Sequence, residues 1–177
     1  LQKLENQRVQ AAEKARFEAA AGYAFRDLTI ADIKFKAIKA GTFTMGSPSS
    51  EIGRNRDETQ HRVTIRNNFW MGKYEVKQKQ WADIMDSNPS HFKGNNLPVE
   101  KVSWDDCQQF ISKLNSRYAA ELPRGYKFAL PTEAQWEYAC RAGTTGPYAG
   151  SLDAMAWYRS NADSKTHAVG TKKANAW

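Results

Sequence analysis

Cysteine and histidine are scarce in this sequence, which has two cysteines and three histidines among its 177 residues. Cys107 and Cys140 are too few for a disulfide framework and lack the short spacing of a structural zinc site. The histidines, His61, His91 and His167, lie far apart, without the spacing that places two imidazoles on one metal ion. The sequence therefore argues against a disulfide-stabilised scaffold and against a histidine metal site.

Long apolar runs are absent as well. No stretch approaches the roughly 18 apolar residues that a membrane span requires, and residues 1–10, LQKLENQRVQ, have no apolar core of a signal peptide. Hydrophobic residues nevertheless make up 41% of the chain and aromatic residues 12%, which is enough for one sizeable core. We therefore expect a soluble globular protein with one domain and a short appendage.

Positive charge is not concentrated in any one part of the chain, although the formal net charge is +7. Residues 1–40, 52–93 and 159–177 each carry a net charge of +3, from eight basic and five acidic residues in the first two segments and four and one in the third. Proteins that bind nucleic acid usually gather such charge in one stripe beside a reading element. The distribution argues against nucleic acid as a partner.

The N-terminal segment, residues 1–21, is rich in Ala, Glu, Gln, Lys and Arg, a composition that favours a helix. Its heptad register is lost at Glu18, so a solvated helical spacer is favoured over a short coiled coil. We expect this spacer over residues 1–30 and the folded domain over residues 31–177. An upstream domain or a helical partner would then be reached through residues 1–21.

Alternation of apolar and polar residues predicts the strands. A period of two over residues 33–37 that resumes at 43–45 predicts a bent strand or a hairpin. Residues 63–65 predict a further short strand, and the apolar and aromatic residues 69–76 predict an inner strand. Between these, residues 47–60 are a loop by composition.

Helix signals alternate with irregular segments in the second half of the chain. Apolar spacing over residues 76–85 predicts a short helix that ends before Pro89, since proline disfavours helix at the preceding residue. Ser103 and Asp106 predict the start of a longer helix, and the residues after Gly143 are expected to be irregular coil. These short elements and long aromatic loops predict an α+β domain with little regular secondary structure.

The most informative stretch is Phe128–Gly143, FALPTEAQWEYACRAG. Thr132 and Gln135 have the spacing of a capping box, in which each side chain satisfies a backbone N–H at the start of a helix. Trp136 lies on the apolar face of that helix and is expected to anchor a core. Glu133 is expected to accept hydrogen bonds from an adjoining loop at a buried helix start, which would make the stretch architectural.

The segment Leu130–Ala139 resembles the LPTEAEWEYA signature of the formylglycine-generating enzyme family, also called the sulfatase-modifying-factor domain. The resemblance extends from about Ile38 to Trp177 and includes the segments Ala40–Ser47, His61–Val63, Phe69–Val76 and Pro98–Trp104. It implies the fold of that family, which is poor in regular secondary structure and has been related to C-type-lectin-like domains. Ala129 departs from most relatives, which have arginine there.

The resemblance also implies a chemistry. Enzymes of the family are copper-dependent oxidases that convert a sulfatase cysteine to formylglycine with a pair of cysteines near the end of the domain, and paired thiolates suit Cu(I). Cys107 and Cys140 match other parts of the motif on two separate helices, and in the family the counterpart of Cys140 can form a disulfide with a residue of the C-terminal half. Trp177 comes before the family's second signature, GLYDMxGNVWEW, so we expect this chain to hold the N-terminal portion of the domain.

Two functions remain open. The first is a non-catalytic module whose aromatic, glycine-rich loops bind a protein or peptide, with carbohydrate as a further candidate ligand. The second is a copper-dependent oxidase whose catalytic half lies outside this chain. Because this sequence has no cysteine pair of the kind that the family's enzymes use, we expect the chain as given not to be catalytic.

A calcium site is the last implication of the resemblance. Family members bind structural calcium near the position that matches Asn161. Gly170 stands here where the family has a nearby aspartate, although Asp163 is close to Asn161 in sequence. Calcium takes six to eight oxygen ligands, which irregular loops can supply through carbonyl groups. Asn161 is therefore the predicted metal ligand.

Overall fold

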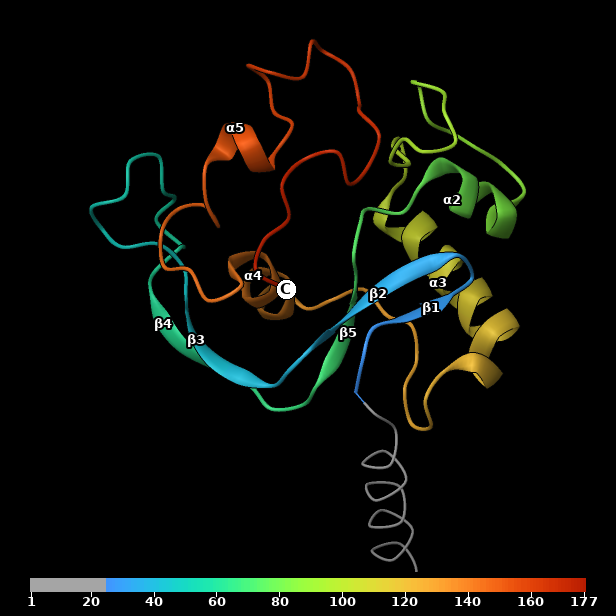
Figure 1. Ribbon diagram of the computed structural model, residues 1–177, viewed down its shortest axis with the longest axis horizontal. Helices are drawn as coiled ribbons and strands as arrows, with labels where there is room; N and C mark the ends of the chain where they lie inside the picture. Colours follow the sequence, from blue (N-terminus) through green and yellow to red (C-terminus); the bar gives the residue numbers. More distant parts are fainter. Residues whose placement is uncertain (1–24) are drawn as a thin grey trace, which may run out of the picture.

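The computed structural model describes residues 25–177 (Figure 1). The spacer and coiled-coil predictions for residues 1–21 lie outside the described residues. Strand β1 (Leu28–Ile30) falls within the segment expected to be spacer, and it pairs with residues 33–35. The folded domain therefore begins a few residues earlier than the predicted boundary at residue 31.

In the described part of the chain, two small antiparallel sheets form the β part of the fold. The first has the order β1-β2-β5, with β2 at Ile33–Ile38 and β5 at Phe69–Gly72, and the second pairs β3 (Gly41–Met45) with β4 (His61–Ile65). Figure 1 shows β2 running into β3 as one curved ribbon, with β4 and β5 following its outer side. The bent strand predicted from the period of two is thereby confirmed.

The prediction of an inner strand over residues 69–76 is wrong in two respects. Strand β5 ends at Gly72, and among the described residues it pairs only with β2, which makes it an edge strand. The apolar residues that suggested a central strand instead face an open groove, because a hydrophobic pattern does not distinguish a sheet interior from a groove wall.

Within residues 25–177, five helical segments complete the fold. They are α2 (Gln78–Met85), α3 (Trp104–Tyr118), the 3-10 turn η1 (Ala119–Glu121), α4 (Glu133–Arg141) and α5 (Leu152–Met155). Helix α2 ends before Pro89 as predicted, and α3 begins after Ser103 as predicted, with a capping box between Ser103 and Asp106. Helix α5 is a single turn in the region predicted to be coil.

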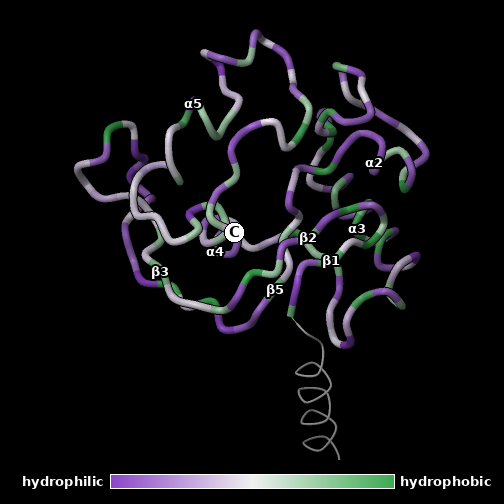
Figure 2. The backbone as a smooth tube through the Cα atoms, viewed as in Figure 1, coloured by the Kyte–Doolittle hydropathy of each residue, from purple (hydrophilic) through white to green (hydrophobic). Residues whose placement is uncertain are grey.

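The core lies where β2, α2 and α3 meet. It consists of the buried residues Ile33, Trp81, Ile84, Phe110 and Leu114. The rings of Trp81 and Phe110 are stacked, with centroids 5.0 Å apart and an interplanar angle of 5°. In Figure 2 hydrophobic positions gather around this junction, whereas the peripheral loops are mostly hydrophilic.

One buried glutamine orders the irregular loop between α2 and α3. Gln78 is 1% exposed, and its side-chain amide donates to the carbonyl oxygens of Phe92 (2.8 Å) and Pro98 (3.2 Å). Its Oε1 accepts hydrogen bonds from the Asn88 side chain (2.9 Å) and the Gly94 backbone N–H (3.1 Å). Three of these four bonds go to backbone groups of the loop and supply partners that a backbone lacks when it belongs to no sheet or helix.

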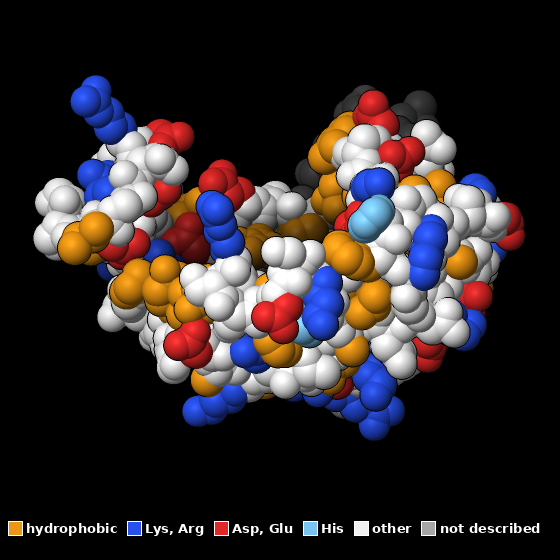
Figure 3. Space-filling model, turned by 90° about the horizontal axis from the view of Figure 1, so that it is seen from above, with side chains coloured by type: hydrophobic (Ala, Val, Ile, Leu, Met, Phe, Trp, Pro, Cys, Tyr) orange, Lys and Arg blue, Asp and Glu red, His pale blue; other side chains and the backbone are white. Residues whose placement is uncertain are grey.

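The outer surface carries mixed charge. On the face shown in Figure 3, Lys and Arg side chains are interspersed with Asp and Glu and form no continuous basic patch. Within residues 25–177, the helices are all too short or too polar to cross a membrane.

Candidate functional site

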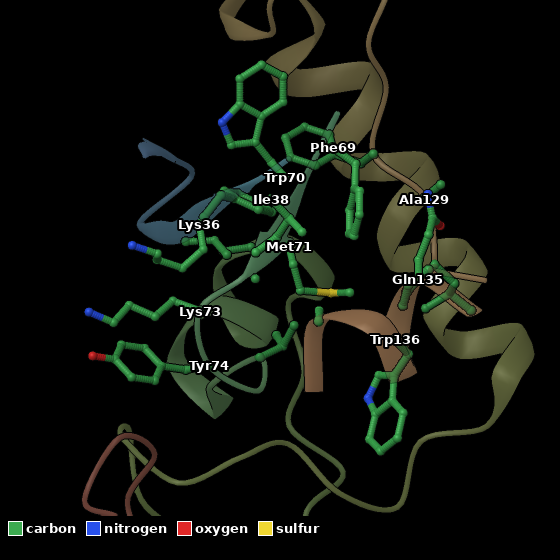
Figure 4. A pocket seen from close by; sticks show the side chains of 18 of the residues that line it. Lys36, Ile38, Phe69, Trp70, Met71, Lys73, Tyr74, Ala129, Gln135 and Trp136 are labelled. Atoms are coloured by element: carbon green, nitrogen blue, oxygen red, sulfur yellow. The ribbon is translucent and has the colours of Figure 1, made fainter. Parts of the chain in front are cut away.

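An open groove of about 700 Å³ runs between β5 and helices α3 and α4. Its floor is formed by core residues, namely Ile33, Trp81, Phe110 and Leu114. Its walls are β5, the segment 126–131 and the exposed side of α4, and Figure 4 shows Met71 pointing from β5 toward α4. Most of the side chains that line the groove are hydrophobic or aromatic, which is the usual composition of a binding surface.

The β5 wall presents an open strand edge to the groove. The Lys73 N–H donates to the Lys34 carbonyl oxygen at 2.8 Å, and the register pairs Phe35 with Gly72. In an antiparallel ladder hydrogen-bonded and non-hydrogen-bonded pairs alternate. The backbone groups of Trp70 and Gly72 therefore point away from β2, toward an edge with no paired strand among the described residues.

The α4 wall begins with the predicted capping box. The Gln135 N–H donates to Thr132 Oγ1 at 3.2 Å, and the Thr132 N–H donates to Gln135 Oε1 at 2.9 Å. The helix ends at Arg141, where Ala142 (φ 47°) and Gly143 (φ 87°) turn into the left-handed region. The capping prediction is confirmed, but this helix start is exposed and not buried.

The expected roles of Trp136 and Glu133 are wrong. Trp136 is 59% exposed and lines the groove, whereas the buried residue of α4 is Ala139, at 7%. Helix α4 packs against β3 and β4 through its other face, so the indole is left on the open side. Glu133 is also exposed and accepts no hydrogen bond from any of residues 25–177.

A charged clamp fixes the opposite face of α4. Glu137 Oε1 accepts hydrogen bonds from Arg141 Nε (2.7 Å) and from the Gly46 backbone N–H (2.9 Å). Arg141 donates in turn to the carbonyl oxygens of Gly46 (2.9 Å) and Gly146 (3.0 Å). The spacing of Glu137 and Arg141 indicates an ion pair in the sequence, but no local signal identifies Gly46 as the third member.

Both cysteines lie beside the groove, on the two helices expected for them. Cys107 belongs to α3 and Cys140 to α4, and both are free thiols. Burial raises the pKa of the Cys107 thiol, and the charge of Asp106 adds to the increase. Cys140 is exposed by surface area, yet neighbouring atoms desolvate its thiol enough to raise its pKa as well. Neither environment lowers a thiol pKa, which is the usual mark of a reactive cysteine.

The histidines do not converge. His61 Nδ1 hydrogen-bonds the Thr59 carbonyl oxygen at 2.9 Å, and His91 lies edge-on to Phe92 in the loop that follows α2. His167 stacks on Trp157 with ring centroids 3.8 Å apart. Over residues 25–177, no group of three or more His, Cys, Asp and Glu side chains is placed to hold a metal ion.

Asn161 holds the turn that follows α5. Its Oδ1 accepts a hydrogen bond from the Tyr158 N–H (2.8 Å), and its Nδ2 donates to the Ala156 carbonyl oxygen (3.1 Å). Asp163 is exposed two residues later in a left-handed conformation, with φ of 50°. These bonds give Asn161 a local structural role, and calcium binding at this residue stays a prediction.

Two indole N–H groups at the groove have no acceptor. Trp81 is 3% exposed, and its Nε1 is buried without a hydrogen-bond partner among residues 25–177. The buried Nε1 of Trp177 is likewise unpaired in the described part of the chain, and both residues line the groove. A buried donor without a partner costs about 1–3 kcal/mol, so these two groups reduce stability among the described residues. Sequence reasoning missed them, since only packing reveals an unpaired donor.

The charged residues that line the groove are mostly basic. They are Lys36, Lys73, Lys127 and Glu75. Lys36 is paired with Asp27 at 2.8 Å, whereas Lys73 and Lys127 have no carboxylate partner within residues 25–177. Figure 4 shows the Lys36 and Lys73 side chains pointing away from Met71 and α4, so these two charges lie outside the apolar part of the groove.

The comparisons with known proteins agree with this fold. A solved structure, PvdO from Pseudomonas aeruginosa, superposes with a TM-score of 0.73 at 23% identity, over 86% of this chain and 68% of that one. The structure confirms the expected α+β fold with little regular secondary structure.

Curated relatives include proteins with different descriptions. "Chaperone protein LppX" of Paenibacillus barcinonensis is 35% identical over 58% of this chain and 48% of its own. The formylglycine-generating enzyme of Mus musculus is 25% identical over 62% of this chain and 40% of its own. This chain thus spans less than half the length of these relatives. The model of the sulfatase-modifying factor enzyme 1-like domain matches residues 33–177, and the chain belongs to that family.

Proposed function

We propose that this chain is a non-catalytic member of its family that binds polypeptide in the groove between β5, α3 and α4. The observation that carries the proposal is the groove itself, an open space of about 700 Å³ with a mostly apolar lining. Soluble monomeric proteins rarely leave a contiguous apolar surface of this kind in contact with water unless a partner covers it.

The side chains at the groove are those that dominate protein interfaces. Trp136 is 59% exposed and Leu130 38% exposed at its walls. Tryptophan is enriched among the residues whose truncation costs most in protein–protein binding, because its large rigid ring loses little entropy on contact. An exposed indole beside a deep apolar floor is therefore suited to a protein partner.

Polypeptide fits the groove better than carbohydrate does. A polypeptide can place apolar side chains against an apolar lining and keep its backbone groups hydrogen-bonded or solvated. A sugar site needs several polar side chains to pair with hydroxyl groups, whereas most of this lining is apolar. The description of the Paenibacillus relative as a chaperone also supports a protein partner.

The alternative function is the copper-dependent oxidase, which the descriptions of the mammalian relatives favour. Its two thiolates would have to come from outside the described residues. Cys107 and Cys140 lie on two separate helices as free thiols, whereas a Cu(I) site of this kind needs two sulfurs close together. The described part of the chain therefore supports binding more strongly than oxidation.

Isothermal titration with the acetylated and amidated peptide EVTVTVTVE tests the proposal. Trp136→Ala is expected to weaken binding several-fold, because it removes an exposed ring from the groove wall. Trp104→Ala is the matched control, since Trp104 is 68% exposed but does not line the groove. Absence of binding to the parent protein, or equal loss in both variants, would show that the groove is not the binding surface.

A further inference from the structure

We draw no further inference here: the strongest candidate, the surface patch that Trp104 and Ile111 of α3 form with Leu130 and Pro131, carries none because nothing in the structure shows what covers it.

Discussion

Glu137 in helix α4 accepts a hydrogen bond from the backbone N–H of Gly46, which lies 91 residues earlier at the end of β3, at 2.9 Å. Arg141 donates to the carbonyl oxygen of the same glycine, so both backbone groups of Gly46 are held by one ion pair. The family signature therefore joins two distant parts of the chain through its second half. Its glutamates have different roles, because Glu133 is exposed and Glu137 is largely buried.

Glu137→Ala should destabilise the protein by roughly 2–3 kcal/mol, since hydrogen bonds to charged groups contribute about 1.5–3 kcal/mol and Arg141 would be left without its carboxylate. Glu133→Ala, on the same helix, should change stability by less than about 0.5 kcal/mol, as exposed sites usually do. Urea denaturation of the two variants measures the difference. Equal costs would contradict the structural role assigned to the Gly46 clamp.

Thr132→Ala should cost about 1 kcal/mol, the usual contribution of an N-cap side chain, because it removes the acceptor of the Gln135 N–H. Thr145→Ala serves as the control, since Thr145 is exposed and outside the helix. Thermal unfolding of both variants provides the measurement. A larger loss in Thr145→Ala than in Thr132→Ala would show that the capping box does not support α4.

Trp81 and Trp136, two of the tryptophans that line the groove, should differ in their effect on stability. Trp81→Ala is expected to cost roughly 3–5 kcal/mol, because it empties a large buried site stacked on Phe110. Trp136→Ala should cost less than about 1 kcal/mol, since its ring is 59% exposed. Chemical denaturation of the two variants measures both changes in the free energy of unfolding. A severe loss of stability in Trp136→Ala would show that this residue anchors the core, as expected from the sequence.

Asp106 should make stability depend on acidic pH. The Ser103 hydroxyl and backbone N–H donate to its carboxylate and hold its pKa below the ordinary value of 3.8. A carboxyl with a lowered pKa in the folded state stabilises the protein above its unfolded pKa, and this stabilisation is lost as pH falls through the folded value. Parent and Asp106→Asn should therefore differ in urea midpoint at neutral pH and converge well below pH 3.8. A constant difference would exclude this carboxylate as the cause.

The chain should not convert a cysteine to formylglycine when it is incubated with copper and a sulfatase-motif peptide. The prediction follows from Cys107 and Cys140, whose thiols have raised pKa values and lie on two separate helices. Mass spectrometry of the peptide detects replacement of the thiol sulfur by an aldehyde oxygen. Conversion that disappears in Cys140→Ser would show that these two residues form the active pair.

The helices and strands whose positions depend on nearby residues could be predicted from the sequence. The capping boxes at Ser103 and Thr132 and the alternation over residues 33–37 correctly placed α3, α4 and β2. The same signals misplaced Trp136, because amphipathic spacing shows that a helix has an apolar face without showing what covers it.

The groove could not be predicted from the sequence for a related reason. Its apolar residues come from segments as distant as Phe35 and Trp177, and they resemble core residues until their exposure is known. The unpaired Nε1 of Trp81 and the clamp at Gly46 both depend on long-range packing. Neither leaves a periodic pattern along the chain.

The four hydrogen bonds of Gln78 make the loop between α2 and α3 a single cooperative unit. The loop has no ladder or helix of its own, so its segments cannot open one at a time without breaking a bond to the same side chain. Native-state hydrogen exchange in this region should therefore follow one common opening free energy and not a gradient along the loop. The sequence of the loop can therefore vary widely only if its backbone still hydrogen-bonds to the side-chain amide of Gln78.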